Sequence, residues 1–269
     1  MKKQVTSIAI IFLFLIGVFS GCVEETPEIK KNKIYVNNDG TADFISIQDA
    51  INASSDNGFI YVSKGTFYES LTINKPINLI GEGKDSTIIS GRYIEEGIES
   101  LISIMTENCS IQGFTLKNGN NSLLDGINAV YSSNISIINN SIVGFNNGIY
   151  LTTSSNMNSI SSNLVLSNTY GIRIQLSEYN TVSENNLINN TRGVFVCCSS
   201  EYNEIHFNNF FENHGFNGYE THELVNYWDN NYWDDYTGID EDNDGYGDTP
   251  YNIPSGTNND SKPLMNPFE

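Results

Sequence analysis

Hydrophobic and polar positions along this chain recur with one long period. Four segments open with glycine and continue with apolar residues on alternate positions, and they start 22, 23 and 22 residues apart. They are Gly126–Ala129, Gly148–Leu151, Gly171–Ile174 and Gly193–Val196. A second series, with spacings of 24, 22 and 23, consists of Asn139, Asn163, Asn185 and Asn208. Two independent markers with one period predict stacked supersecondary units rather than a globular fold around a single centre.

Each repeat contains strand signals and no helical pattern. Ile149 and Leu151 alternate with Tyr150, so we expect the two aliphatic side chains to point inward and the tyrosine outward. Earlier apolar runs bounded by turn residues predict further strands at 34–36, 59–62, 71–73, 77–80 and 87–89. The chain is therefore predicted to be all-β, a solenoid of coils whose equivalent residues stack about 4.8 Å apart.

One short helix is expected near the start of the coils, at residues 46–51. Ser46 and Asp49 form a capping-box pair, and Ile47, Ala50 and Ile51 share one face. An amphipathic helix at this place would cover the open apolar end of the stack. The recurring asparagines predict ladders at the coil corners, because their amides can bond from coil to coil and asparagine tolerates a left-handed backbone.

The N-terminus has the pattern of an exported protein. Lys2 and Lys3 precede an uncharged apolar run at 8–19, which is too short to span a membrane comfortably. The small residues before Cys22 resemble a lipobox, although Phe19 departs from it, and this implies a lipid anchor on Cys22. A plain signal peptide is the alternative. We expect a signal peptide at 1–22, a tether at 23–33, coils at 34–223 and a Trp/Tyr-rich tail at 224–269.

The charge of the chain limits its partners. The formal net charge is −19 and the pI is about 4.3, which argues against nucleic acid and anionic membrane surfaces. Membrane contact is expected only through the N-terminal anchor, on the outside of the cytoplasmic membrane. Apart from Cys22, the chain has Cys109, Cys197 and Cys198, and we expect these three to be free thiols.

Several segments resemble a known family. Residues 39–44 with 47–51, and later 65–69 and 78–83, resemble the opening of pectin-methylesterase-type and NosD-like right-handed parallel β-helices. Residues 231–238, 248–251 and 263–265 resemble the C-terminal segment of archaeal β-helix surface proteins. The resemblance implies a right-handed parallel β-helix with an irregular tail. It leaves the activity open, because this architecture serves lyases, hydrolases, esterases, adhesins and assembly factors.

The chemistry of those families is not visible in the chain. The sequence signatures of pectin methylesterases, polygalacturonases and pectate lyases do not occur. The copper role attached to the NosD name also lacks a ligand pattern, since His206, His214 and His222 are eight residues apart without a Met or Cys cluster.

The most specific local motif is an acidic loop at 240–248. Carboxylates at loop positions 1, 3, 5 and 9, a glycine at 6 and a backbone carbonyl at 7 match most of a calcium loop. The ligands would be Asp240, Asp242, Asp244, Tyr246 and Asp248. Tyr251 stands at position 12, where an EF-hand has a bidentate glutamate. We expect structural calcium that fastens the tail over the last coil; an acidic solvated loop is the alternative.

Two further patterns come from the repeats themselves. Tyr150, Arg173 and Phe195 occupy equivalent outward positions, where aromatic faces and fixed donors suit a sugar chain. Glu178 and Glu201 are register partners whose carboxylates could act as in a retaining glycosidase, although repeat copying explains them more simply.

The sequence thus predicts an exported, lipid-anchored, monomeric surface protein that recognises polysaccharide or another surface partner without catalysis. A polysaccharide lyase or hydrolase with an unrecognised site is one alternative, and an assembly accessory of the NosD kind is another.

Overall fold

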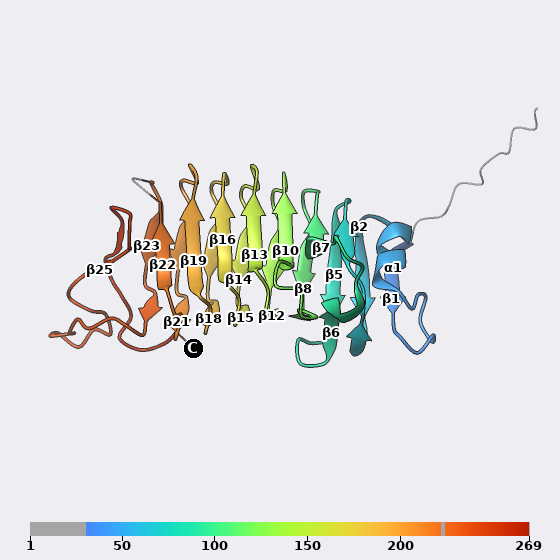
Figure 1. Cartoon of the computed structure of the whole chain (residues 1–269), viewed down its shortest axis with the longest axis horizontal. Helices are drawn as coiled ribbons and strands as arrows, with labels where there is room; N and C mark the ends of the chain where they lie inside the picture. The colour runs from blue at the N-terminus through green and yellow to red at the C-terminus, as the bar shows by residue number, and fades with distance from the viewer. Residues whose placement is uncertain (1–30, 222–223, 269) are drawn as a thin grey trace, which may run out of the picture.

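The computed structural model describes residues 31–221 and 224–268, and its strands stack into an elongated solenoid (Figure 1). Helix α1 (Ile47–Ala53) lies at one end and the C-terminal segment at the other (Figure 1). A short 3-10 helix, Gly91–Tyr93, interrupts the strands. The expected all-β parallel solenoid is confirmed, while its right-handed sense stays a prediction.

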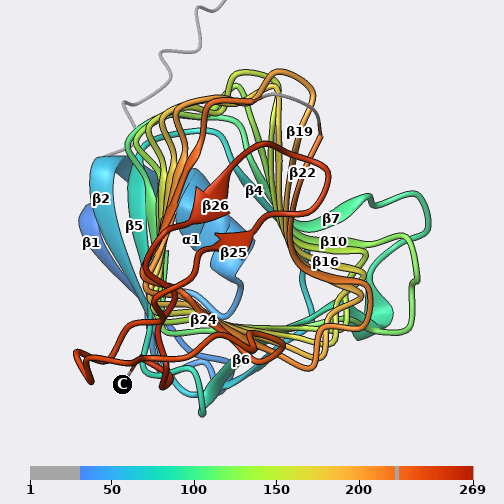
Figure 2. The same cartoon turned by 90° about the vertical axis from the view of Figure 1, so that its left-hand side faces the viewer.

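The coils build three sheets, seen end-on in Figure 2. Sheet A contains, in spatial order, β1 (Lys31–Val36), β2 (Ser54–Val62), β5 (Ile77–Gly81), β8 (Ser110–Gln112), β11 (Ser136–Ile138), β14 (Ser159–Ser161), β17 (Thr181–Ser183), β20 (Glu204–His206), β23 (Tyr227–Asp229), β26 (Asn259–Asp260) and β25 (Tyr251–Asn252). Sheet B contains β24 (Tyr232–Trp233), β21 (Asn209–Phe211), β18 (Asn186–Ile188), β15 (Leu164–Leu166), β12 (Ser141–Val143), β9 (Thr115–Lys117), β6 (Thr87–Ser90) and β3 (Gly65–Phe67). Sheet C contains β22 (Phe216–Glu220), β19 (Arg192–Cys197), β16 (Tyr170–Gln175), β13 (Asn147–Thr152), β10 (Asp125–Val130), β7 (Ser100–Ile104) and β4 (Leu71–Ile73).

Neighbouring strands pair in parallel, except the antiparallel pair β25–β26. The predicted alternation holds inside the coils, where Ile149 and Leu151 are fully buried and Tyr150 lies on the outer face. Aliphatic residues therefore stack in register through the core, in the row Ile127, Ile149, Ile172 and Val194. Burial of this continuous core is the main stabilising term, because each coil alone could not hide its apolar face.

Asparagine ladders join the coils at the corners, but their members differ from the expected series. The ladder between sheets A and B consists of Asn140, Asn163, Asn185, Asn208 and Asn231. Asn140 is fully buried and belongs to it, while Asn139 is exposed. The left-handed residue at each corner precedes the ladder asparagine, as at Asn139 and Glu184. The expectation that the ladder asparagines themselves turn the corners was therefore wrong.

Helix α1 caps the N-terminal end as expected. Ser46 accepts a hydrogen bond from the Asp49 N–H at 3.2 Å, and Ile47, Ala50 and Ile51 are fully buried. Glu69 of the next coil also accepts the Ile47 and Gln48 N–H groups. These contacts satisfy donors that a helix start otherwise leaves open.

The C-terminal segment first continues the solenoid and then covers it. β23 and β24 extend sheets A and B, so coil strands continue beyond residue 223, where we expected the tail to begin. Trp233 stacks on Phe210 at 4.3 Å and on Tyr251 at 4.2 Å between ring centroids. Asp260 ends the asparagine ladder, because its carboxylate accepts the Asn231 N–H at 2.8 Å. The two tryptophan-containing segments thus close the last coil with aromatic rings.

The described residues include no helix of sufficient length and hydrophobicity to cross a membrane. The expected signal peptide at 1–22, the anchor Cys22 and the tether up to residue 30 lie outside the described residues. Cys109, Cys197 and Cys198 are free thiols, as expected.

Candidate functional site

The outer face of sheet C carries one column of large side chains that crosses successive coils. In register, the column consists of Asn128, Tyr150, Arg173, Phe195 and Tyr219. The Phe195 and Tyr219 rings are stacked, with centroids 5.3 Å apart and planes 11° apart. All five side chains are half-buried, so each presents one side to solvent. The three expected ligand-binding residues, Tyr150, Arg173 and Phe195, therefore lie side by side on one face.

Arg173 occupies the middle of this column and is held from several sides. Its guanidinium carbon lies 4.8 Å from the Tyr150 ring centroid and 5.9 Å from that of Phe195. Its Nη2 donates to Gln175 Oε1 at 2.8 Å, and the Tyr150 hydroxyl donates to the same oxygen at 2.6 Å. Cation–π contact and a shared acceptor fix the guanidinium before any ligand arrives.

A second outer column is formed by the first residues of β16 and β19, Tyr170 and Arg192, which are register partners. Tyr170 packs edge-on against Phe195 with centroids 5.3 Å apart. Arg173 and Arg192 both lie over the Tyr170 ring, at 5.2 Å and 4.7 Å from its centroid. Two arginines and three aromatic rings, Tyr150, Tyr170 and Phe195, thus share one patch of surface. We call these five residues the sheet C patch.

Unpaired polar atoms gather around the sheet C patch. Four buried side-chain atoms among the described residues have no hydrogen-bond partner, and three of them belong to sheet C: Asn128 Oδ1, Asn147 Oδ1 and Arg173 Nε. Buried polar atoms are normally paired, so such a group marks a place where a ligand or water completes the bonding.

Asp125, the first residue of β10, is a buried carboxylate in the same sheet. Its Oδ1 accepts the Asn147 N–H at 3.0 Å and the Asn147 Nδ2 at 2.7 Å. Burial raises the pKa of the Asp125 carboxyl, while the two asparagines Asn146 and Asn147 and the charge of Arg173 lower it in part. Sheet C therefore also contains a carboxyl group with an unusual proton affinity.

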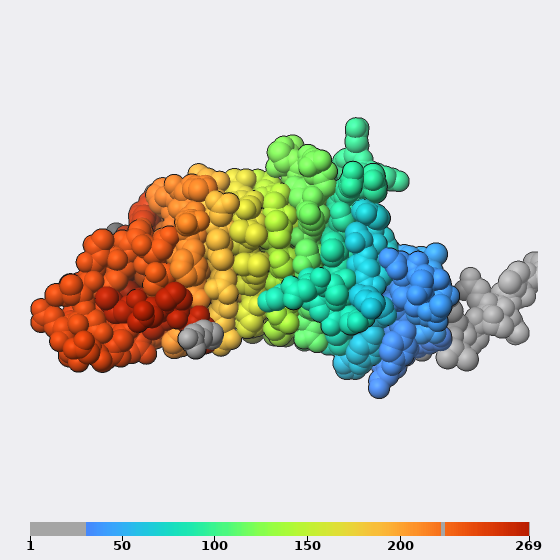
Figure 3. All heavy atoms as spheres, turned by 90° about the horizontal axis from the view of Figure 1, so that it is seen from below, coloured from blue at the N-terminus to red at the C-terminus, as the bar shows by residue number. Residues whose placement is uncertain are grey.

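A cleft of about 300 Å³ lies at the N-terminal end of the column. Its floor includes Ser103 and Asn128, and its wall is the loop at 97–99 before β7. Figure 2 shows the green loops that precede β7 and β10 projecting beyond the coils, and Figure 3 shows them rising from the surface. The outer face of sheet C is thus bounded at one end and open along the coils.

The weak catalytic candidates Glu178 and Glu201 lie elsewhere, in the turns that follow β16 and β19. The Tyr179 N–H bonds to the Glu201 carbonyl at 3.3 Å, and the neighbouring Tyr179 and Tyr202 rings are stacked. Within residues 31–221 and 224–268, no hydrogen bond or ion pair joins either carboxylate to Arg173. The structure therefore places the two glutamates in turns and Arg173 within strand β16.

The acidic loop brings part of its expected ligand set together. Asp240, Asp242 and Asp244 place one carboxylate oxygen each within 4.8 Å of one another, while Asp248 accepts the Glu241 N–H instead. The Asp244 N–H lowers the pKa of Asp242 most strongly, but the surrounding aspartates raise it overall. Gly245 has a φ of +93°, the left-handed turn that the motif requires. These carboxylates repel one another, so a hard cation would stabilise the loop.

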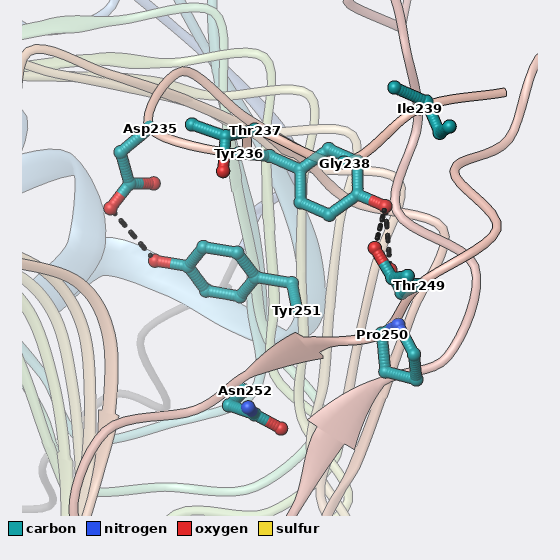
Figure 4. A pocket seen from close by; sticks show the side chains of 9 residues that line it. All are labelled: Asp235, Tyr236, Thr237, Gly238, Ile239, Thr249, Pro250, Tyr251 and Asn252. Carbon is teal, nitrogen blue, oxygen red and sulfur yellow. Dashed lines mark hydrogen bonds between the residues drawn. The ribbon is translucent and has the colours of Figure 1, made fainter.

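The tail also contains an open hollow of about 500 Å³, shown in Figure 4. The Tyr236 hydroxyl donates to the Thr249 carbonyl at 2.6 Å, and the Tyr251 hydroxyl donates to Asp235 at 3.1 Å. Burial raises the pKa of the Tyr251 hydroxyl. Both hydroxyls are therefore engaged within the tail.

Sequence reasoning did not find the second outer column. If inward and outward residues alternated strictly along each strand, Tyr170 and Arg192 would point inward like the buried residues two positions later. Both are instead half-exposed. The glycine after each one explains the exception, since a Cβ on Gly171 would lie 2.6 Å from the Gly193 carbonyl oxygen. The backbones approach closely there, and the preceding residue turns outward. The glycine that marks the repeat was the available signal.

Comparison with known proteins assigns the chain to a family. A family model described as "Periplasmic copper-binding protein (NosD)" matches residues 24–238. Among solved structures, a pectin methylesterase mutant in complex with a hexasaccharide superposes with a TM-score of 0.60 at 16% identity, covering 74% of this chain and 78% of that one. Pectin methylesterase PemA from Erwinia chrysanthemi gives 0.53 at 16% identity, covering 80% and 74%. At these identities the superpositions establish the fold alone.

Two curated plant proteins share shorter segments. "Pectinesterase/pectinesterase inhibitor 18" of Arabidopsis thaliana is 36% identical over 78 residues, covering 26% of this chain and 14% of that protein. "Probable pectinesterase/pectinesterase inhibitor 6" of the same plant is 31% identical over 110 residues, covering 36% and 20%. The chain therefore spans a fifth or less of the length of these relatives.

The described residues do not fit the copper in the family's description. Copper favours thiolate, thioether and imidazole ligands. The one group of three His, Cys, Asp or Glu ligands found in 31–221 and 224–268 is the hard carboxylate set of the acidic loop. Burial raises the pKa of the Cys109 thiol to about 12, which disfavours the thiolate.

The expected NosD-like parallel β-helix is thus confirmed, and the family's periplasmic description is consistent with export. The chain belongs to the NosD family and shares the parallel β-helix fold of the pectin methylesterases.

Proposed function

We propose that this protein is an exported binding protein that holds a saccharide chain along the outer face of sheet C. The observation that carries the proposal is the sheet C patch, in which three aromatic rings and two arginines lie together on one outer face. Sugar rings stack on aromatic faces and need fixed hydrogen-bond partners. The patch offers both.

The solenoid suits a polymer. Equivalent positions repeat about every 4.8 Å along the axis, so a chain lying across the coils meets a similar position on each one. The structural neighbour with the highest TM-score given above was solved with a hexasaccharide, which agrees with a saccharide as ligand. We also propose that a lipid on Cys22 anchors the chain to the outside of the cytoplasmic membrane.

A glycan array followed by calorimetry tests the proposal. Tyr150→Ala and Phe195→Ala should each weaken binding of the array's strongest ligand roughly tenfold, because each removes a stacking surface. Tyr179→Ala is the matched control, since Tyr179 is an exposed aromatic stacked on Tyr202 in a turn outside the patch. Equal effects of the three variants, or no binding of any glycan, would refute the proposal.

Asp125 favours a second candidate function, cleavage of the bound saccharide. A buried carboxyl with a raised pKa beside Arg173 has the character of a general acid. The Asp125 N–H bonds to the Glu99 carbonyl at 2.9 Å, and Glu99 lines the cleft, so Glu99 is the candidate for a second carboxylate. Reducing-sugar and unsaturated-product assays that detect turnover, and its loss in Asp125→Asn, would establish an enzyme.

For the acidic loop we propose a structural calcium ion held by Asp240, Asp242 and Asp244. Three mutually repelling carboxylates and the left-handed Gly245 support a cation at this place. Its role would be to fasten the tail over the aromatic cap, without contact to the saccharide.

A further inference from the structure

We infer that the saccharide is anionic and that Arg173, with Arg192 beside it, receives its acidic groups. This inference rests on the proposed saccharide-binding function and adds the chemical class of the ligand. It follows from where the chain places its few arginines and from what surrounds them.

The arginines are scarce and concentrated. The chain has 13 Lys and Arg against 32 Asp and Glu, and its only arginines are Arg92, Arg173 and Arg192. Two of the three lie over the same ring, Tyr170, on the outer face of sheet C. In a chain with a net charge of −19, this face is an exception that attracts anions locally.

Neither arginine of the patch has a carboxylate partner within salt-bridge distance. In the described part of the chain, the single ion pair within 4.0 Å joins Lys31 and Asp43. Asp125 attracts Arg173 from a greater distance, but its Oδ1 is occupied by the amide groups of Asn146 and Asn147. The positive charge of Arg173 therefore remains uncompensated at short range.

Arg173 is also prepared for an incoming anion. Its Nε is buried without a partner, and its Nη2 is held by Gln175. A half-buried cation without a counter-charge has lost part of its hydration without gaining a partner. Binding of an anion at Arg173 is therefore more favourable than at an exposed lysine. The planar guanidinium matches carboxylate and sulfate oxygens in pairs.

The shared chemistry of the ligand is thus an oxyanion on a sugar, supplied by a uronic acid carboxylate or by a sulfate ester. Three hexasaccharides on one backbone distinguish these sources: hexagalacturonate, its carboxyl-reduced form, and the reduced form after sulfation. Calorimetry with the full exported chain at low and moderate salt measures each affinity.

We expect at least one charged hexasaccharide to bind tenfold or more tightly than the reduced form, because charge-assisted bonds are stronger and salt-sensitive. Arg173→Gln should abolish this preference and Arg192→Gln should reduce it. Arg92→Gln is the matched control, since Arg92 stacks on Tyr93 outside the patch. Unchanged thermal melting of each variant verifies its fold.

The outcomes separate the two proposals. Equal binding of charged and reduced hexasaccharides, weakened by Phe195→Ala, would overturn the anion inference and keep the saccharide proposal. A charge preference that survives Arg173→Gln would also overturn the inference. If none of the three hexasaccharides binds while the glycan array yields an uncharged ligand, the anion inference is overturned and the saccharide proposal stands. If no glycan of the array binds either, both proposals fall.

Discussion

Asn185→Ala tests whether the asparagine ladder holds the coils together. Asn185 is fully buried, and its Oδ1 accepts the N–H and the Nδ2 of Asn163, each at 3.0 Å. Its Nδ2 donates to the Ile160 carbonyl at 2.9 Å and to Asn208 Oδ1 at 3.0 Å. Alanine leaves the buried Asn163 N–H without its acceptor, while Asn163 Nδ2 keeps the Ile137 carbonyl at 2.9 Å.

The expected loss follows from that unsatisfied donor. An unsatisfied buried donor costs about 1–3 kcal/mol, so the variant should lose about 2 kcal/mol of unfolding free energy. Asn186→Ala is the control, because Asn186 is half-buried and its one side-chain bond, from Asn209, has a second acceptor in Phe268. We expect the control to cost less than about 1 kcal/mol.

Urea unfolding followed by circular dichroism and tryptophan fluorescence measures both variants. A solenoid can unfold in parts, so the two signals are compared before a single free energy is assigned. If Asn185→Ala and Asn186→Ala shift the midpoint equally, the ladder does not carry the stability that we assign to it.

Three further predictions concern the C-terminal half. Calcium at millimolar concentration should raise the melting temperature measured by scanning calorimetry, and EGTA should lower it. Asp242→Asn should abolish both effects. An unchanged melting temperature of the unmodified protein in calcium and in EGTA would contradict the calcium proposal. Burial raises the pKa of Glu220 above its ordinary 4.5, so the folded state binds a proton more readily than the unfolded state. The free energy of unfolding should therefore rise as the pH falls from 7 towards 4.5. The urea midpoint of Glu220→Gln should rise less over this pH range than that of the unmodified protein. Trp233→Ala should cost about 3–5 kcal/mol, since the ring is buried between Phe210 and Tyr251; a loss below 1 kcal/mol in the same assay would contradict its capping role.

The coils could be predicted from the sequence because the residues that form them recur at a regular spacing. Ile149 and its equivalents must be apolar once per coil, and Gly148 must be small where backbones approach. The same reasoning found α1, whose cap and apolar face are local features. The helix cap is visible in one sequence because it is local, and the coil positions are visible because they recur at a fixed spacing.

The residues whose orientation we predicted wrongly are positioned by contacts between coils. Asn139 and Asn140 are adjacent, and only the stacking shows that the second points inward while the first turns the corner. Tyr170 and Arg192 turn outward because the glycine row distorts the strand, which alternation alone does not contain. The buried state of Asp125 likewise arises from side chains of a neighbouring coil.

The central claim is that the outer face of sheet C binds a saccharide, and a crystal structure with hexagalacturonate tests it most directly. The account predicts sugar rings against Tyr150 and Phe195, with a carboxylate at the Arg173 guanidinium. A hexasaccharide bound in the tail hollow, or on Tyr35 and Tyr61 of sheet A, with the sheet C patch bare, would contradict it.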